Sequence, residues 1–127
     1  MSKLVISEEA RSEDLTGIAL ALNEIVRLPV TMRSLKYPGV RVELGQVLDK
    51  NFSGPVLEEV LRTGKAMRTV PDSGAYKGVP VSVAPIVAEG RTVAALGIVD
   101  VIGTIDIPEV FGKYGDVLRQ VARSGPE

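Results

Sequence analysis

The sequence of 127 residues predicts a single α+β domain, in which one antiparallel sheet of about five strands is flanked by helices. Apolar residues recur at helical spacing in three segments, and they alternate or run together in five short segments. These segments follow one another in the order α-β-β-α-β-β-β-α. The length suits one domain, residues 1–127, and leaves little room for a second.

The first helix is predicted over residues 12–28, with Ser12 as its N-cap and Pro29 as its end. Its main apolar face consists of Leu15, Ile18, Ala19, Leu22, Ile25 and Val26. Leu20 lies off this face. Two interpretations follow: a helix with a few exposed apolar groups, or a helix whose second side is covered by another subunit.

Two period-2 segments, residues 30–35 and 40–44, predict a β-hairpin with one polar face. Pro38 and Gly39 lie between them and suit a type II turn, where glycine supplies the positive φ. The residues that follow are polar and predict a loop.

A second helix is predicted to begin at Ser53 as its N-cap and to end at Gly64. A strand follows at residues 66–70, and residues 71–78 have the composition of turns.

The two longest strands are predicted at residues 79–87 and 92–101, joined by a turn at 88–91. Both are apolar on both faces, so we expect them to be covered on two sides, with the last strand in the middle of the sheet. A closing helix is predicted over residues 108–122. Its apolar stripe consists of Val110, Phe111, Tyr114, Val117, Leu118 and Val121.

From these patterns, seven side chains are expected to be nearly buried: Leu22, Leu57, Leu61, Leu96, Ile98, Phe111 and Leu118.

The composition excludes several kinds of function. The chain has no His, Cys or Trp, so zinc, haem, iron–sulfur and copper sites and the Ser-His-Asp and Cys-His catalytic sets are not expected. We therefore expect no metal and no cofactor. A net charge of −1 argues against nucleic acid as a partner. No apolar stretch suits a membrane span or an export signal, so a cytoplasmic location away from membranes is expected.

The element order resembles the profilin-like group of small folds, which includes PAS, GAF and roadblock/longin domains. Residues 81–100 resemble the closing hairpin of GAF and Cache-type sensors, because a Pro-Ile pair is followed by glycines among apolar residues. This resemblance implies a small sensor or scaffold domain.

Five segments also resemble an archaeal family, found mainly in methanogens and known as a domain of unknown function. They are LPVTMR at 28–33, PGVRV at 38–42, GPVLEEV at 54–60, RTVPDSG at 68–74 and GVPV at 78–81. The resemblance implies one domain in an archaeal, cytoplasmic setting. It implies no activity, cofactor or site residue.

The loop after residue 71 is the best candidate for a binding site. Asp72, Ser73, Tyr76 and Lys77 place an acid, a hydroxyl, a phenol and an amine within six residues. Turn formation alone also explains Asp72 and Ser73.

Basic side chains form a second candidate site. Arg33, Arg41 and Arg68 would bind an anion together with Lys77 if the hairpin's polar face adjoins the loop; otherwise they are ordinary solvated strand charges. Asp100 and Asp106 are either paired carboxylates or, for Asp106, the cap of the last helix.

The sequence therefore predicts a non-enzymatic module of the sensor or scaffold kind that binds a small, anionic ligand or a partner protein. The alternatives are an enzyme that uses Asp72, Tyr76 and Lys77, and a structural subunit of a larger assembly. A homodimer that pairs through the first helix, around Leu20, is also expected. The alternative is pairing strand to strand through an exposed sheet edge at residues 40–44, which Arg41 and Glu43 disfavour.

Overall fold

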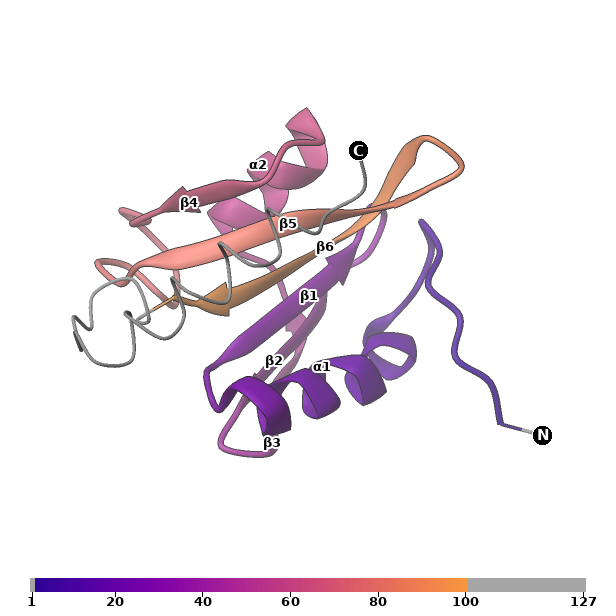
Figure 1. The fold of residues 1–127 in the computed structure, drawn as a ribbon, viewed down its shortest axis with the longest axis horizontal. Helices are drawn as coiled ribbons and strands as arrows, with labels where there is room; N and C mark the ends of the chain where they lie inside the picture. The colour runs from indigo at the N-terminus through magenta and orange to yellow at the C-terminus, as the bar shows by residue number, and fades with distance from the viewer. Residues whose placement is uncertain (1, 101–127) are drawn as a thin grey trace, which may run out of the picture.

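The computed structural model describes residues 2–100, which form two helices and one six-stranded antiparallel sheet (Figure 1). The strands lie in the order β3-β2-β1-β6-β5-β4. The elements along the chain are α1 (Ser12–Val26), β1 (Val30–Ser34), β2 (Gly39–Glu43), β3 (Gln46–Phe52), α2 (Pro55–Thr63), β4 (Met67–Thr69), β5 (Val81–Ala88) and β6 (Arg91–Val99). The prediction that the last and longest strand lies in the middle is confirmed, because β6 pairs with β1 on one side and β5 on the other.

The sixth strand, β3, corrects the prediction of five. It occupies residues that the sequence predicted as a polar loop. Its residues are mostly exposed, and Asp49, Lys50 and Asn51 have low strand propensity. This edge strand is stabilised by its pairing with β2 and by two side chains that pack into the core, Val47 on the α1 side and Phe52 on the α2 side. The polar residues between them obscure this pattern in the sequence.

Both helix starts differ from prediction by one residue. The N-cap of α1 is Arg11, not Ser12, and the Arg11 backbone N–H donates to Asp14 Oδ2 at 2.9 Å. The N-cap of α2 is Gly54, not Ser53, with proline at the first helical positions. The predicted end of α2 at Gly64 is confirmed, since Gly64 has a φ of 71° and caps the helix in the left-handed conformation.

The glycine between β1 and β2 is required for a reason other than the one predicted. Gly39 does not have a positive φ, so the type II turn is wrong. A Cβ on Gly39 would lie 1.8 Å from the carbonyl oxygen of Met32. The glycine therefore permits close approach of two backbones.

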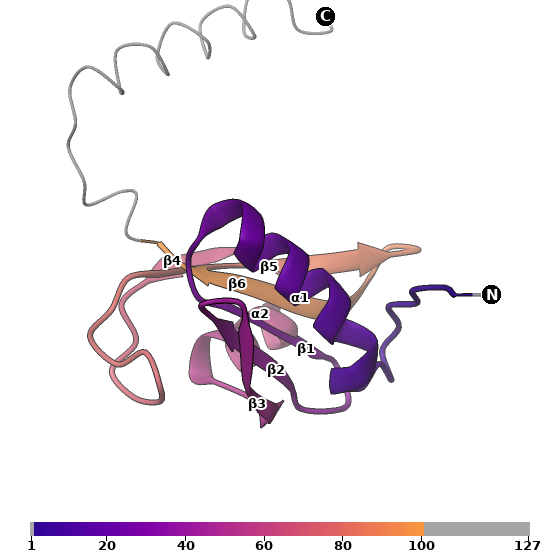
Figure 2. The ribbon, with the colours of Figure 1, turned by 90° about the horizontal axis from the view of Figure 1, so that it is seen from below.

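The two helices cover opposite faces of the sheet and different halves of it (Figures 1 and 2). On one face α1 packs over β1–β3, around Ala10, Leu15, Ala19, Val30, Met32, Val40 and Val42. On the other face α2 packs over β5 and β6, around Phe52, Val56, Leu57, Val60, Val81, Val83, Ala95 and Val99. Burial of each of the larger side chains in these clusters, the valines, leucines, Met32 and Phe52, stabilises the fold by about 1.5–3 kcal/mol.

The core prediction is confirmed for Leu57, which is 2% exposed. It is wrong for four side chains that are only half-buried: Leu22, Leu61, Leu96 and Ile98. Three of these, Leu22, Leu96 and Ile98, belong to the α1 side, where residues 2–100 place no helix over β5 and β6. Phe111, Leu118, Asp106 and the predicted helix at 108–122 lie outside the described residues.

Candidate functional site

The loop at residues 71–80 closes part of the sheet face that carries α2. Gly78 N–H donates to the Pro71 carbonyl at 2.9 Å, and Val79 N–H donates to the Tyr76 carbonyl at 3.0 Å. Gly74 and Gly78 have φ values of 85° and 79°, which favour glycine. These turns hold the Tyr76 side chain against the sheet.

Tyr76 is held by two charged side chains of β2. Its hydroxyl donates to Glu43 Oε2 at 2.7 Å and accepts from Arg41 Nε at 3.0 Å. Arg41 Nη2 donates to the same Glu43 oxygen at 2.8 Å. The ring lies edge-on to Phe52, with 6.4 Å between centroids. We call Arg41, Glu43 and Tyr76 the β2–loop clasp.

The electrostatics of the clasp favour holding over catalysis. Burial, and then the Glu43 hydrogen bond, raise the pKa of Tyr76 to about 12. Burial alone would raise the pKa of Glu43, but the hydrogen bonds from Tyr76 and Arg41 outweigh it, and the pKa lies below its ordinary value. At neutral pH Glu43 is therefore ionised and Tyr76 is protonated, so neither is poised to exchange a proton.

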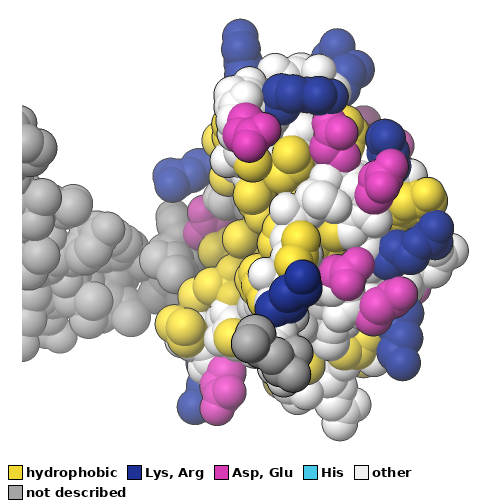
Figure 3. Space-filling model, turned by 90° about the vertical axis from the view of Figure 1, so that its right-hand side faces the viewer, with side chains coloured by type: hydrophobic (Ala, Val, Ile, Leu, Met, Phe, Trp, Pro, Cys, Tyr) yellow, Lys and Arg dark blue, Asp and Glu magenta, His cyan; other side chains and the backbone are white. Residues whose placement is uncertain are grey.

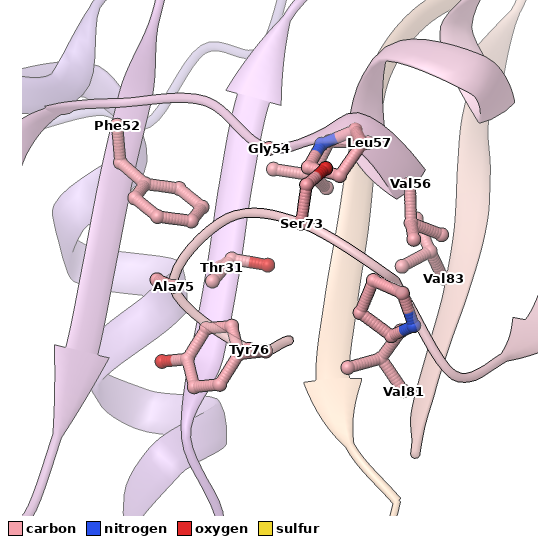
Figure 4. Close-up of a pocket in the computed structure, with 12 residues that line it drawn as sticks. Thr31, Phe52, Gly54, Val56, Leu57, Ser73, Ala75, Tyr76, Val81 and Val83 are labelled. Atoms are coloured by element: carbon pink, nitrogen blue, oxygen red, sulfur yellow. The ribbon is translucent and has the colours of Figure 1, made fainter. Parts of the chain in front are cut away.

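Behind the clasp lies a small cavity between the loop, α2 and the sheet (Figure 4). Its walls are mainly apolar, with Phe52, Leu57 and Val83 among them, and Thr31 and Ser73 add hydroxyls. The cavity volume is about 30 Å³. That space suits ordered water, whereas sites for small molecules usually have about 300–1,000 Å³.

The structure brings together two of the seven predicted site residues, Arg41 and Tyr76. Asp72, Ser73 and Lys77 are exposed on the loop. Arg68 pairs with Ser82, which pairs with Ile98, so Arg68 lies on the α1 side of the sheet, opposite Arg41.

Arg33 shares the face of the clasp but has other partners. Its guanidinium donates to Ser53 Oγ at 2.9 Å and to the carbonyls of Ser34 and Leu35. Ser53 Oγ in turn donates to Glu58 Oε2 at 2.7 Å. Arg33 therefore ties β1 to the start of α2.

The sequence reasoning missed Glu43. In the sequence Glu43 is only one of several polar residues that alternate along the hairpin, although Arg41 and Glu43 are two residues apart on a strand and so share a face. Asp100 also has a simple partner, because Ser82 Oγ donates to Asp100 Oδ2 at 2.6 Å.

A second concave surface lies at the end of α1, beside the β2–β3 turn. This α1 groove has a volume of about 990 Å³ and is lined by Leu20, Asn23, Glu24, Arg27, Leu28, Pro29, Glu43, Leu44 and Gly45. The Asn23 side chain fixes its floor: Oδ1 accepts from the Gly45 backbone at 2.8 Å, and Nδ2 donates to the Leu28 carbonyl at 2.8 Å. Leu44 projects from its rim and is 94% exposed.

Residues 2–100 contain neither a metal-binding cluster nor a membrane-spanning helix. No three or more His, Cys, Asp or Glu side chains of these residues are arranged to hold a metal ion. None of the helices in this part of the chain has the length and apolar character needed to cross a membrane.

Fold and site together define a small α+β protein in which polar side chains hold a loop against the sheet and a groove beside α1 is lined by both apolar and polar residues. The chain belongs to the family described as "Uncharacterized protein conserved in archaea (DUF2111)", whose model matches residues 22–102. It is 42% identical over 99 residues to "Uncharacterized protein MJ0405" of Methanocaldococcus jannaschii, which covers 77% of this chain and 76% of that protein. The predicted archaeal family is thus confirmed. No solved structure matches the chain.

Proposed function

We propose that this protein is a non-enzymatic interaction module of the scaffold kind, and that its α1 groove binds a second copy of the chain. The observation that carries the proposal is Leu44, a fully solvated leucine held in a left-handed backbone conformation at the groove's rim.

The turn itself gives no reason for a leucine. Leu44 and Gly45 form the two-residue connection between β2 and β3, with φ values of 51° and 74°. Both positive values match a type I′ turn, in which Asn-Gly is the favoured pair. Leucine in this conformation costs about 1 kcal/mol, and at 94% exposure it gains almost no burial in return. Contact with a partner would supply that burial.

The groove offers further apolar surface beside Leu44. Leu20, Leu28 and Pro29 line it, and Leu20 is the side chain around which self-association is predicted from the sequence. In a two-fold dimer one patch covers its own copy, so Leu44 of each protomer would enter the groove of the other. A net charge of −1 offers little repulsion against such pairing.

Binding of a small anionic ligand under the loop is a weaker candidate. The cavity of about 30 Å³ would have to open, which breaks the β2–loop clasp. Glu43 already neutralises Arg41, so an anion would compete with a carboxylate 2.8 Å away. An enzyme that uses Asp72, Tyr76 and Lys77 is the least supported candidate. Asp72 and Lys77 are exposed, whereas the Tyr76 hydroxyl donates to Glu43 against the sheet, so the three groups do not converge.

A scaffold role agrees with the profilin-like class that the element order resembles. We further propose that the protein has a profilin-like fold and a cytoplasmic location, and that the partner it binds is a second copy of itself.

Sedimentation equilibrium of the full chain and of Leu44→Asn tests the proposal. We expect the wild type to dimerise at tens of micromolar and Leu44→Asn to be monomeric. At a dilution where both proteins are monomeric, the variant is expected to melt at the same temperature as the wild type or higher, because asparagine favours the left-handed conformation.

Glu89→Asn is the matched control. Glu89 and Gly90, with φ values of 54° and 76°, form the equivalent two-residue turn between β5 and β6, at the other end of the sheet. This variant is expected to dimerise like the wild type. If the wild type is monomeric, the proposal that a second copy is the partner is wrong. If the Leu44→Asn variant still dimerises, the interface does not lie in the α1 groove.

A further inference from the structure

On the α1 side of the sheet, the half formed by β5 and β6 is apolar except at one end, where Ser82 donates to Asp100. This half lacks a covering helix within residues 2–100. Ala84, Ile86, Leu96 and Ile98 share this half-face, because Ala84 pairs with Leu96 and Ile86 with Ala94 in the register. Ala84 is exposed and the other three are only partly buried. Figure 3 shows hydrophobic side chains gathered in a band toward the side that faces the viewer of Figure 1.

One flank of α1 borders the same half-face. At about 100° per residue, Ile18, Leu22 and Ile25 lie about 140–200° around the helix from Leu20, which lines the α1 groove on the β3 side. Ile25 is 77% exposed. The flank and the half-face together form an apolar trough with two walls, a helix and a sheet.

The chain supplies a segment with matching properties. The sequence at 108–122 predicts an amphipathic helix whose stripe carries two aromatic and four aliphatic side chains. A stripe of this kind needs an apolar surface to cover it.

We propose that residues 108–122 of the same chain pack into this trough, antiparallel to α1, and complete the α1 side of the sheet. The dimensions agree. A helix of 15 residues is about 22 Å long, and β5, with eight residues, spans about 27 Å.

The place where the chain leaves the sheet favours its own segment over that of a second copy. Val99 N–H donates to the Pro29 carbonyl and Asp100 N–H to the Pro80 carbonyl, so β6 ends between β1 and β5 at the end of the trough. Residues 101–107 can reach about 23 Å, and packed helices lie about 8–10 Å apart. A short tether of this kind gives an effective concentration in the millimolar range.

Alkylation of a single cysteine in the full chain tests this proposal, since the chain has no cysteine of its own. Ala84→Cys places a thiol of similar size on the half-face. With a bulky maleimide, we expect it to react about tenfold more slowly, or slower still, than Ala66→Cys, an exposed control before β4.

Two further variants identify the cover. Leu118→Asp, in the apolar stripe, is expected to restore fast labelling at Ala84→Cys, whereas Gln120→Asp, on the polar side of the predicted helix, is expected to leave it slow. Fast labelling without Leu118→Asp overturns the proposal. Protection that weakens on dilution also overturns it, in favour of a second copy. Leu44→Asn does not touch this trough, so this test and that of the α1 groove fail independently.

Discussion

The described chain consists of two halves with the same order of elements, α1-β1-β2-β3 and α2-β4-β5-β6, joined where β1 pairs with β6. Each helix covers its own half, but on opposite faces of the sheet. Each half is therefore left with one face that its own helix does not cover.

The two remaining faces are treated differently. The first half is closed by the loop at 71–80, which docks through a polar contact, the β2–loop clasp. The second half presents apolar side chains that are partly exposed within residues 2–100. A polar clasp sets orientation with a modest gain in stability, whereas an apolar face gains stability from any well-fitting cover. The following variants measure this difference.

The largest loss is expected for Leu57→Ala, where α2 packs on its own half. Leu57 is 2% exposed, and its truncation leaves a cavity that costs about 2–5 kcal/mol. Urea denaturation measures the loss. Leu48→Ala on β3, where leucine is 50% exposed, is the control and is expected to cost less than about 1 kcal/mol. Equal losses would contradict the assigned core.

Leu96→Ala tests the apolar face of the second half, which α2 does not cover. If residues 108–122 cover the half-face, as proposed, this variant destabilises the full chain by about 2–4 kcal/mol. Measured in a Leu118→Asp background, the same change is expected to cost only about 1 kcal/mol, because the side chain is then partly exposed. Equal costs in both backgrounds would show that Leu118 does not help to cover Leu96.

The clasp is tested by Glu43→Gln, which removes the carboxylate that pairs with Arg41 and Tyr76. At neutral pH we expect a loss of about 1–3 kcal/mol. Because the pKa of Glu43 is lowered from 4.5, its contribution is present above pH 4.5 and is lost as the pH falls through the folded-state value. Denaturation of wild type and variant across this range is expected to show the difference shrinking with acid. A constant difference would mean that the carboxylate charge is not what holds the loop.

The alkaline side is tested by titrating the tyrosines through phenolate absorbance. The pKa of Tyr76 is raised from 10.0 to about 12, so its stabilising effect is complete below pH 10 and is lost as the pH rises through 12. Tyr76→Phe is expected to remove a titration step near pH 12. Loss of a step near pH 10 instead would place the Tyr76 hydroxyl in water.

The smallest effect is expected at the β5–β6 turn. Glu89→Asn should raise stability by about 0.5–1 kcal/mol, because asparagine tolerates the φ of 54° better than glutamate does. Thermal denaturation measures the gain. A loss would mean that the glutamate has a contact of its own there.

The sequence predicts the strongly patterned parts of this molecule well. The spacing of apolar residues predicts the β1–β2 hairpin and the central position of β6, and Gly64 predicts the end of α2. The strand β3 was missed because charged residues such as Asp49 and Lys50 obscure its pattern, and its pairing with β2 is tertiary. The reason for Gly39 was also hidden, because the atom that excludes a Cβ belongs to Met32 on the neighbouring strand.

The candidate site was predictable only in part. Arg41 and Tyr76 were both named, but their contact joins a strand to a loop more than thirty positions later, and no local pattern encodes that distance. The convergence of Arg68 with Arg41 was a reasonable expectation until the register placed them on opposite faces. No periodic pattern in the sequence marks Leu44 as a candidate interface residue. Its importance rests on its left-handed backbone conformation and its exposure, which only the structure shows.

The joint between the halves has a consequence for the order of folding. Strands β1, β2 and β3 pair with neighbours in the sequence, as do β4, β5 and β6, so each half forms from local contacts. The pairing of β1 with β6 aligns Val30 with Ile98 and closes the longest loop in the sheet. Closing a long loop costs chain entropy before its contacts repay it, which slows folding. Formation of this central ladder is thus expected to limit the folding rate, with the two halves assembled before they meet.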